Sequence, residues 1–321
     1  MNVFIDQNQS YKDDPMLGVY TSLVLARLVM ARPSDTFVFT SPDSLLNNLP
    51  NASFSRLGKT GIAWLDRYRL IRRAKSLGAA RLIYPGSVAG NWSIDSVNGV
   101  KGPVVPAGNF HFGDAGLPVV LPGVAQPLSW TAEESIKTQY TAGKSFFLYV
   151  GVLGESGGVI DLLKAFSVFK KWQQSNMQLV LTGYASQDTN VLAEKLESYK
   201  YRQDVIILRN LPLEEVTKLV AAAYALVYPS TSGFPLGCYA ATQWGKALIA
   251  ADSSVNRATA ARAEWVAAGE INEAFSTAMI AVYRDEQKLR ALAPAPVQTD
   301  GWSAMLQTLW QQLSIPAREN G

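Results

Sequence analysis

Short apolar runs alternate along the chain with stretches whose apolar residues recur at helical spacing. In the first half this pattern predicts strands at residues 3–5, 36–40 and 81–84, and helices at residues 19–31 and 62–77. Pro33 follows the first helix and Gly78 the second, in positions where these residues end helices. The alternation of strand and helix predicts an α/β protein with parallel sheets covered by helices.

The second half repeats the pattern more regularly. Strands are predicted at residues 146–150, 178–182, 205–208, 225–228 and 247–252, with helices at 159–172, 190–199 and 213–222. Their apolar runs are continuous rather than alternating, which is typical of parallel strands buried on both faces.

Between residues 86 and 123 the pattern gives way to glycine, proline, serine and asparagine, with short extended pieces around residues 104–105 and 118–121. Polar residues then accumulate at 122–144, which indicates a domain boundary. We expect a first domain at residues 1–125, a second at 126–300 and a C-terminal helix at 301–321.

Composition narrows the class of protein. The chain has 321 residues, of which 48% are hydrophobic and 17% charged, so two globular domains of ordinary size are expected. A formal net charge of +3 is too small to indicate a nucleic-acid partner. Cys238 is the single cysteine and His111 the single histidine, which excludes an internal disulfide and a closed zinc site.

The sequence favours a cytoplasmic location. It has no basic N-terminal region followed by an apolar core, and its apolar runs are shorter than a membrane span. A basic stretch at residues 66–75 could meet an anionic partner or a membrane surface. Its charges fall on several faces of the predicted helix, so we interpret it as a solvated outer face, with at most peripheral membrane contact.

Two glycine-containing segments carry the candidate chemistry. Residues 151–158 follow a predicted buried strand and read Gly-Val-Leu-Gly-Glu-Ser-Gly-Gly. They form either a phosphate cradle or a strand-to-helix turn. The absence of lysine and arginine from the segment favours the turn, and neither a Walker loop nor a dinucleotide fingerprint is present. Residues 229–252 follow another predicted strand and begin with a loop that contains Gly233 and Phe234. A helix of small residues comes next, and Gly245 and a second strand follow it.

Together these segments, above all over residues 143–312, resemble the retaining glycosyltransferases of family 4. The resemblance implies an α/β, GT-B-like fold with two Rossmann-like domains whose parallel sheets face a cleft. The first domain would be the acceptor side and the second the donor side, with the helix at 301–321 returning toward the first. Residues 17–21 resemble the glycine loop of this family, with Gly18 as its glycine.

The resemblance also implies the ligand. The donor would be a nucleotide diphosphate sugar, and small residues would let backbone N–H groups approach its phosphates. We expect no cofactor and no metal. The donor-binding positions that survive are Gly18, Gly151, Gly158, Gly233, Phe234 and Leu236. His111 is near the sequence position where the family has a histidine that faces the cleft, so it is a candidate site residue. The alternative is that His111 has only a structural role.

The chain departs from the family at the charged positions of this site. Two glutamates of the family are replaced by Ser232 and Ala240. Basic residues are expected where the chain has Val19, Val152 and Gly157. These cations would hold the pyrophosphate and stabilise the charge that grows as it leaves.

Two hypotheses of function follow. The first is a retaining hexosyltransferase that transfers a sugar from a nucleotide sugar to a glycan acceptor in surface polysaccharide assembly. The second is a catalytically silent pseudo-glycosyltransferase that binds a glycan or a protein partner. The loss of acids and cations from one site favours the second. A nicotinamide enzyme on a related fold is disfavoured because the dinucleotide fingerprint is absent.

Overall fold

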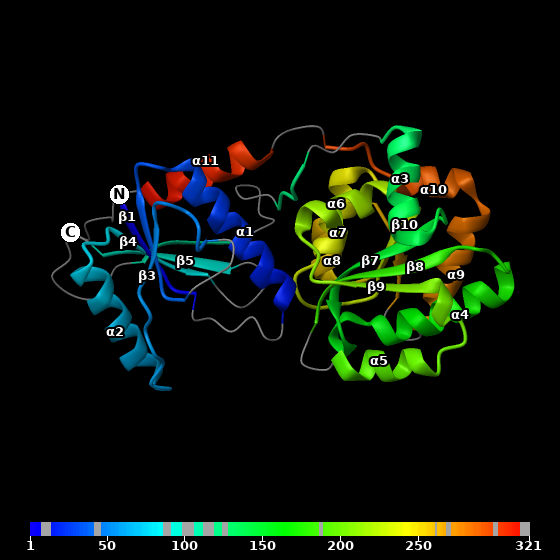
Figure 1. Ribbon diagram of the computed structural model, residues 1–321, viewed down its shortest axis with the longest axis horizontal. Helices are drawn as coiled ribbons and strands as arrows, with labels where there is room; N and C mark the ends of the chain where they lie inside the picture. The colour runs from blue at the N-terminus through cyan, green and yellow to red at the C-terminus, as the bar shows by residue number, and fades with distance from the viewer. Residues whose placement is uncertain are drawn as a thin grey trace. The chain divides into compact units, whose positions relative to one another are not determined.

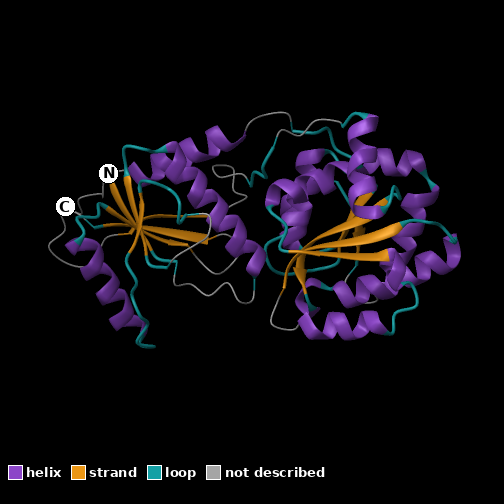
Figure 2. Ribbon diagram, viewed as in Figure 1, coloured by secondary structure: helices purple, strands orange, loops and turns teal. Residues whose placement is uncertain are grey.

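The structure is a computed structural model that describes residues 1–7, 14–41, 46–85, 91–97, 106–111, 119–123, 128–185, 189–260, 262–267, 271–297 and 301–314. The chain forms two compact units. The first comprises Met1–Tyr11, Leu17–Pro118 and Gly301–Gly321, and the second comprises Lys12–Met16 and Val119–Asp300. Each unit contains one six-stranded sheet with helices packed on it (Figures 1 and 2).

The first sheet has the strand order β3-β2-β1-β4-β5-β6. Its strands are β1 (Asn2–Ile5), β2 (Thr36–Phe39), β3 (Ala52–Phe54), β4 (Arg81–Pro85), β5 (Asn91–Ser96) and β6 (Pro106–His111). Its helices are α1 (Pro15–Ala31), α2 (Ala63–Ser76) and α11 (Gly301–Ser314). The first four strands are parallel, as predicted, because helices and long connections link them.

The far edge of this sheet differs from the prediction of a parallel sheet. β5 pairs antiparallel with β4, and β6 pairs antiparallel with β5. Only five residues separate β4 from β5, which is too few for the crossover that two parallel strands require. β3 and β5 were not predicted, since β3 has only three residues and β5 mixes polar with apolar residues.

Strand register assigns the helices to opposite faces of the first sheet. Phe4, Val38 and Leu82 are aligned across β1, β2 and β4 and pack with Leu70 and Ala74 of α2. The neighbouring positions point to the other face, where Phe37 contacts Trp310 of α11 with ring centroids 6.4 Å apart. The Nε of Arg81 donates to the carbonyl oxygen of Leu313 there, at 2.6 Å. Helix α11 therefore packs on the first unit.

The second sheet is parallel throughout, with the order β12-β11-β10-β7-β8-β9. Its strands are β7 (Phe146–Leu153), β8 (Gln178–Ala185), β9 (Val205–Arg209), β10 (Ala225–Tyr228), β11 (Leu248–Ala251) and β12 (Glu264–Val266). Its helices are α3 (Trp130–Thr141), α4 (Val159–Gln173), α5 (Thr189–Glu197), α6 (Leu213–Ala222), α7 (Leu236–Trp244), α8 (Ser254–Thr259), α9 (Ile271–Arg284) and α10 (Glu286–Leu292). Helices lie on both faces of the sheet (Figure 2).

The core of the second unit follows from the apolar runs of its strands. The first five residues of β7 are all buried, as are all four of β10 and of β11. Phe147 makes edge-on ring contacts with Phe169 of α4 and with Tyr224, at 5.2 and 5.7 Å. The predicted strands and helices from residue 146 to residue 252 are present, with ends that shift by a few residues, and the α/β class is confirmed.

Two helices depart from the sequence prediction. Helix α3 occupies part of the polar segment that we interpreted as a boundary, and the Ser129 hydroxyl caps it by accepting from the Ala132 N–H at 3.3 Å. Helix α1 begins at Pro15 rather than at residue 19, because proline suits the first position of a helix. None of the described helices has an apolar stretch of the length that a membrane span requires.

Candidate functional site

The second sheet reverses its strand order between β7 and β10. From this point β8 and β9 continue to one side, and β11 and β12 to the other. β7 and β10 are parallel neighbours, so the loops that follow them leave the same edge of the sheet. Open parallel sheets bind their ligands at such a reversal. We call residues 151–158, which include the last three residues of β7, and residues 229–236, which end at the first residue of α7, the switch-point loops. They form the candidate site of the second unit.

The first switch-point loop packs against the side chain of Tyr149. The Tyr149 hydroxyl donates to the carbonyl oxygen of Val152 at 2.9 Å. Its ring stacks on Tyr228, with centroids 6.0 Å apart and planes inclined by 14°. Burial, reinforced by the charge of the Asp14 carboxylate, raises the pKa of Tyr149 far above its usual value. The hydroxyl is therefore a neutral donor.

Tyr149 accounts for two glycines of this loop. A Cβ on Gly151 would lie 2.5 Å from the Tyr149 hydroxyl oxygen and 2.7 Å from its Cζ. A Cβ on Gly157 would collide with the same hydroxyl and with the Val152 carbonyl oxygen. Gly158 has a φ of +69° and precedes α4. This packing supports the interpretation of the loop as a strand-to-helix turn.

The second switch-point loop is tied to the first by Ser230. Its hydroxyl donates to the carbonyl oxygen of Ser156 at 3.0 Å and lies 2.8 Å from that of Ser232. The Ser230 carbonyl oxygen accepts from the side-chain amide of Asn256 at 2.8 Å, and this amide also donates to the Ala251 carbonyl oxygen at 2.9 Å. The ends of β7, β10 and β11 are thus held together by hydrogen bonds within the protein.

The predicted donor-site positions divide by exposure. Ser232 and Gly233 are exposed on the second switch-point loop. Phe234, just before α7, is almost completely buried, and Leu236 and Ala240, in the first two turns of α7, are fully buried. Of the two positions where glutamates were expected, one therefore faces solvent and the other is a methyl group in the core.

Sequence reasoning missed one acid at this site, Asp14. It belongs to the second unit, and its Oδ2 accepts a hydrogen bond from the backbone N–H of Phe234 at 2.6 Å. The side chain is buried, with 8% exposure. A carboxylate thus lies beside Gly233, because a Cβ added at this glycine would be 3.2 Å from Oδ2 of Asp14. The only signal in the sequence is an aspartate before a proline, which is typical of a helix start.

The switch-point loops have an acidic electrostatic character. Both are described in full, and Glu155 is the one charged residue in their sequence. The buried carboxylate of Asp14 adds a second negative charge. Arg257, in the helix after β11, is engaged by the Asp252 carboxylate, with its Nε 2.5 Å from one oxygen and its Nη2 2.7 Å from the other.

Two predicted residues lie in the first unit. Gly18 is inside helix α1, so the expectation of a glycine loop before this helix is wrong. The helix starts earlier because Asp14 and Pro15 begin it. His111 is the last residue of β6, and its side chain lies outside the described part of the structure.

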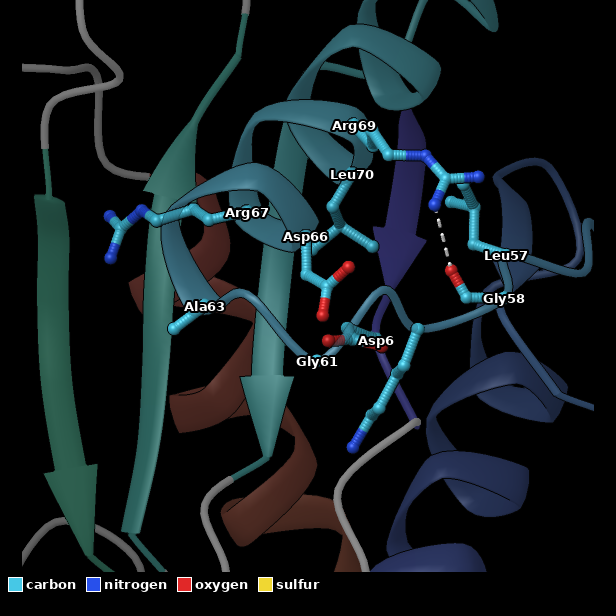
Figure 3. A pocket seen from close by; sticks show the side chains of 10 residues that line it. Asp6, Leu57, Gly58, Gly61, Ala63, Asp66, Arg67, Arg69 and Leu70 are labelled. Atoms are coloured by element: carbon cyan, nitrogen blue, oxygen red, sulfur yellow. Dashed lines mark hydrogen bonds between the residues drawn. The ribbon is translucent and has the colours of Figure 1, made fainter.

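The first unit contains a pocket of about 510 Å³ at the carboxyl end of β1 and the start of α2. Its charged lining residues are Asp6, Lys59, Asp66, Arg67 and Arg69. The carboxylates of Asp6 and Asp66 point toward one another there, whereas Arg67 extends away from the centre (Figure 3).

Hydrogen bonds fix the two carboxylates of this pocket. Oδ1 of Asp66 accepts from the backbone N–H and the hydroxyl of Thr60, at 2.7 and 2.6 Å. These bonds lower the pKa of Asp66, which keeps it ionised. Oδ1 of Asp6 accepts from the Thr40 hydroxyl at 3.0 Å. The pocket therefore presents oriented acceptors beside cationic donors, an arrangement suited to a ligand rich in hydroxyl groups.

Solved structures share the fold of this chain, and two of the three described here are glycosyltransferases. HepE of Anabaena, crystallised with UDP and glucose, superposes with a TM-score of 0.61 at 14% identity, covering 98% of this chain and 100% of that chain. WaaG, a glycosyltransferase involved in lipopolysaccharide biosynthesis, gives 0.59 at 14% identity, covering 98% and 96%. A glycosyltransferase from Rickettsia africae ESF-5 gives 0.57 at 12% identity, covering 98% and 94%. The GT-B-like fold is confirmed.

Sequence comparison supplies the family. No curated protein matches the chain significantly. The family model described as glycosyl transferases group 1 matches residues 131–295, just over half of the chain. The match spans both switch-point loops and the reversal of strand order between them. This chain belongs to the glycosyl transferases group 1 family.

Proposed function

We propose that this protein is a catalytically silent member of its family, which binds a glycan through the pocket of the first unit and does not turn over nucleotide sugars. By the same proposal it works in the cytoplasm. The observation that carries the proposal is the packing of Gly157. By resemblance this position holds a lysine in active relatives, and here any side chain would collide with Tyr149 and with the Val152 carbonyl oxygen.

The energetic consequence concerns the leaving pyrophosphate. Removing one electrostatic contact to a developing charge commonly costs roughly 3 kcal/mol of barrier, or about a hundredfold in rate. The switch-point loops offer no lysine or arginine, and Glu155 and Asp14 would repel a pyrophosphate. A nucleotide sugar placed there would meet acids where its departure needs cations.

Glycan binding is supported by the pocket of the first unit. Ligand pockets commonly span about 300–1,000 Å³, and a volume of about 510 Å³ falls in this range. Asp6 and Asp66 would accept hydrogen bonds from sugar hydroxyls, and Lys59 would donate to ring or acidic oxygens.

The binding test uses an array of bacterial surface oligosaccharides, followed by calorimetry with the saccharide that scores. We expect saturable binding that Asp6→Asn and Lys59→Gln each weaken by about tenfold, which corresponds to roughly one hydrogen bond to a charged group. Asp161→Asn, a matched change on the exposed surface of α4, should leave binding unchanged. Absence of saccharide binding, or equal loss in the control, would refute the glycan part of the proposal.

A second candidate is a working transferase that delivers sugar from a nucleotide-sugar donor to a glycan in surface polysaccharide assembly. Asp14 favours it, because this carboxylate lies next to the loop where a family glutamate is replaced by Ser232. The structural relative HepE was crystallised with UDP-glucose. Under this candidate, nucleotide release from a donor panel would be measurable in the wild type and abolished by Asp14→Asn.

A further inference from the structure

Helix α2 presents an aromatic and cationic stripe to solvent. Leu70 and Ala74 face the first sheet and are buried. On the opposite side, Trp64 and Tyr68 are one turn apart and are 72% and 56% exposed. Arg72 and Lys75 continue the same row for two more turns and are also exposed. We call these four residues the α2 stripe.

The side chains of the α2 stripe differ from the other polar side chains of the helix in their contacts. Arg67 pairs with Asp95, with Nη2 3.2 Å from Oδ2, and the Nε of Arg73 donates to the Ser55 hydroxyl at 2.8 Å. Within the described part of the chain, by contrast, the side chains of Arg72 and Lys75 make no hydrogen bond or ion pair, and the rings of the stripe make no ring contact. The cations on the flanks of α2 are thus engaged within the first unit, whereas those of the stripe face solvent.

We propose that the α2 stripe binds the surface of a membrane that contains anionic lipids. The helix would lie along the headgroups, with Trp64 and Tyr68 at the polar–apolar boundary. Indole and phenol rings favour that depth, because each combines an apolar body with one polar group. Ile62, which is 49% exposed just before the helix, extends the apolar end of the same surface.

The charge of the helix complements such a surface. Residues 63–76 contain five basic residues and one acid, Asp66, so the helix carries a net positive charge. A nucleic acid is the less suitable occupant, since the whole chain carries a formal net charge of only +3. A bilayer needs a local patch of cations beside exposed aromatic residues, which is what the stripe supplies.

The test is co-sedimentation with two kinds of vesicle. One is made of phosphatidylcholine alone, and the other also contains roughly 30% phosphatidylglycerol, which gives its surface a negative charge. The wild type should bind the anionic vesicles and release them at high salt. Each cation near an anionic surface strengthens binding about fivefold, so Arg72→Gln with Lys75→Gln should weaken it roughly 25-fold. Trp64→Ala with Tyr68→Ala should weaken binding while leaving its salt dependence unchanged.

A matched control removes two exposed cations from the second unit, by Lys171→Gln with Lys195→Gln. This variant should bind like the wild type, and thermal unfolding should show that all variants fold. Equal binding to neutral and anionic vesicles, or equal weakening by the control, would overturn the proposal. Duplex DNA that binds more tightly than the vesicles, and loses binding in the same α2 variants, would also overturn it and assign the stripe to a nucleic acid.

Discussion

The substitution Gly151→Ala tests whether Tyr149 is the reason for the glycines at the switch point. The new Cβ would lie 2.5 Å from the Tyr149 hydroxyl oxygen, and ordinary contact begins at 3.4 Å, so the two atoms must separate by about 0.9 Å. The Tyr149 ring cannot withdraw, because it is fully buried and stacked on Tyr228. Overpacking of this kind typically costs about 1–3 kcal/mol, and we expect roughly 2 kcal/mol here.

A double-mutant cycle isolates the contact. In a Tyr149→Leu background the hydroxyl and the outer ring atoms are absent, so Gly151→Ala should cost at least about 1 kcal/mol less than in the wild type. Tyr149→Leu is itself destabilising, since it leaves a cavity and removes the donor to the Val152 carbonyl oxygen. The coupling between the two changes, rather than either single effect, is the quantity that the structure predicts.

Urea unfolding followed by circular dichroism gives the four free energies of the cycle, and thermal unfolding gives a second estimate. A loss of about 2 kcal/mol should lower the unfolding temperature of a unit of this size by roughly 4–8 °C. If Gly151→Ala leaves stability unchanged, or costs the same in both backgrounds, the glycine is not required by Tyr149. The phosphate-cradle interpretation would then regain support.

Three further predictions concern single side chains. Asp14→Ala should lower the free energy of unfolding by about 2 kcal/mol and Asp14→Asn by less, because asparagine still offers an acceptor to the Phe234 N–H; urea unfolding compares them. Thr60→Val should raise the pKa of Asp66, measured by carboxyl NMR titration, because the Thr60 hydroxyl is the main cause of its lowering. The stabilising contribution of ionised Asp66 is present above its unfolded pKa and is lost as pH falls through the folded value. Cys238 should resist thiol reagents at pH 8 until the protein unfolds, since burial raises its pKa to about 12; rapid labelling of the native protein would contradict this.

The fold of the second unit was predictable because its strands are buried on both faces. A short, continuous apolar run such as that of β7, placed between segments with regular helical spacing, is typical of a buried parallel strand. The edge of the first sheet was not predictable by the same reasoning. β5 reads Asn-Trp-Ser-Ile-Asp-Ser and mixes polar and apolar residues as many loops do, and its pairing with β4 depends on a short connection.

The candidate site was only partly visible in the sequence. The switch-point loops could be located, because strand ends and glycines mark them. The role of Tyr149 could not be foreseen, since a tyrosine within an apolar run indicates core and says nothing about where its hydroxyl lies. Asp14 was hidden for a different reason. Its partner Phe234 is 220 residues away along the chain, and no local pattern reports a contact of that separation.

Nucleotide release tests catalytic silence most directly. Purified protein at stoichiometric concentration is incubated for hours with UDP- and GDP-hexoses, together with any oligosaccharide that binds it, and free nucleotide is quantified by chromatography. The account predicts release no faster than in buffer, because the loops that should stabilise the leaving pyrophosphate carry Glu155 and no cation. Release that is proportional to protein concentration, and that disappears in Asp14→Asn, would contradict it and establish a working transferase.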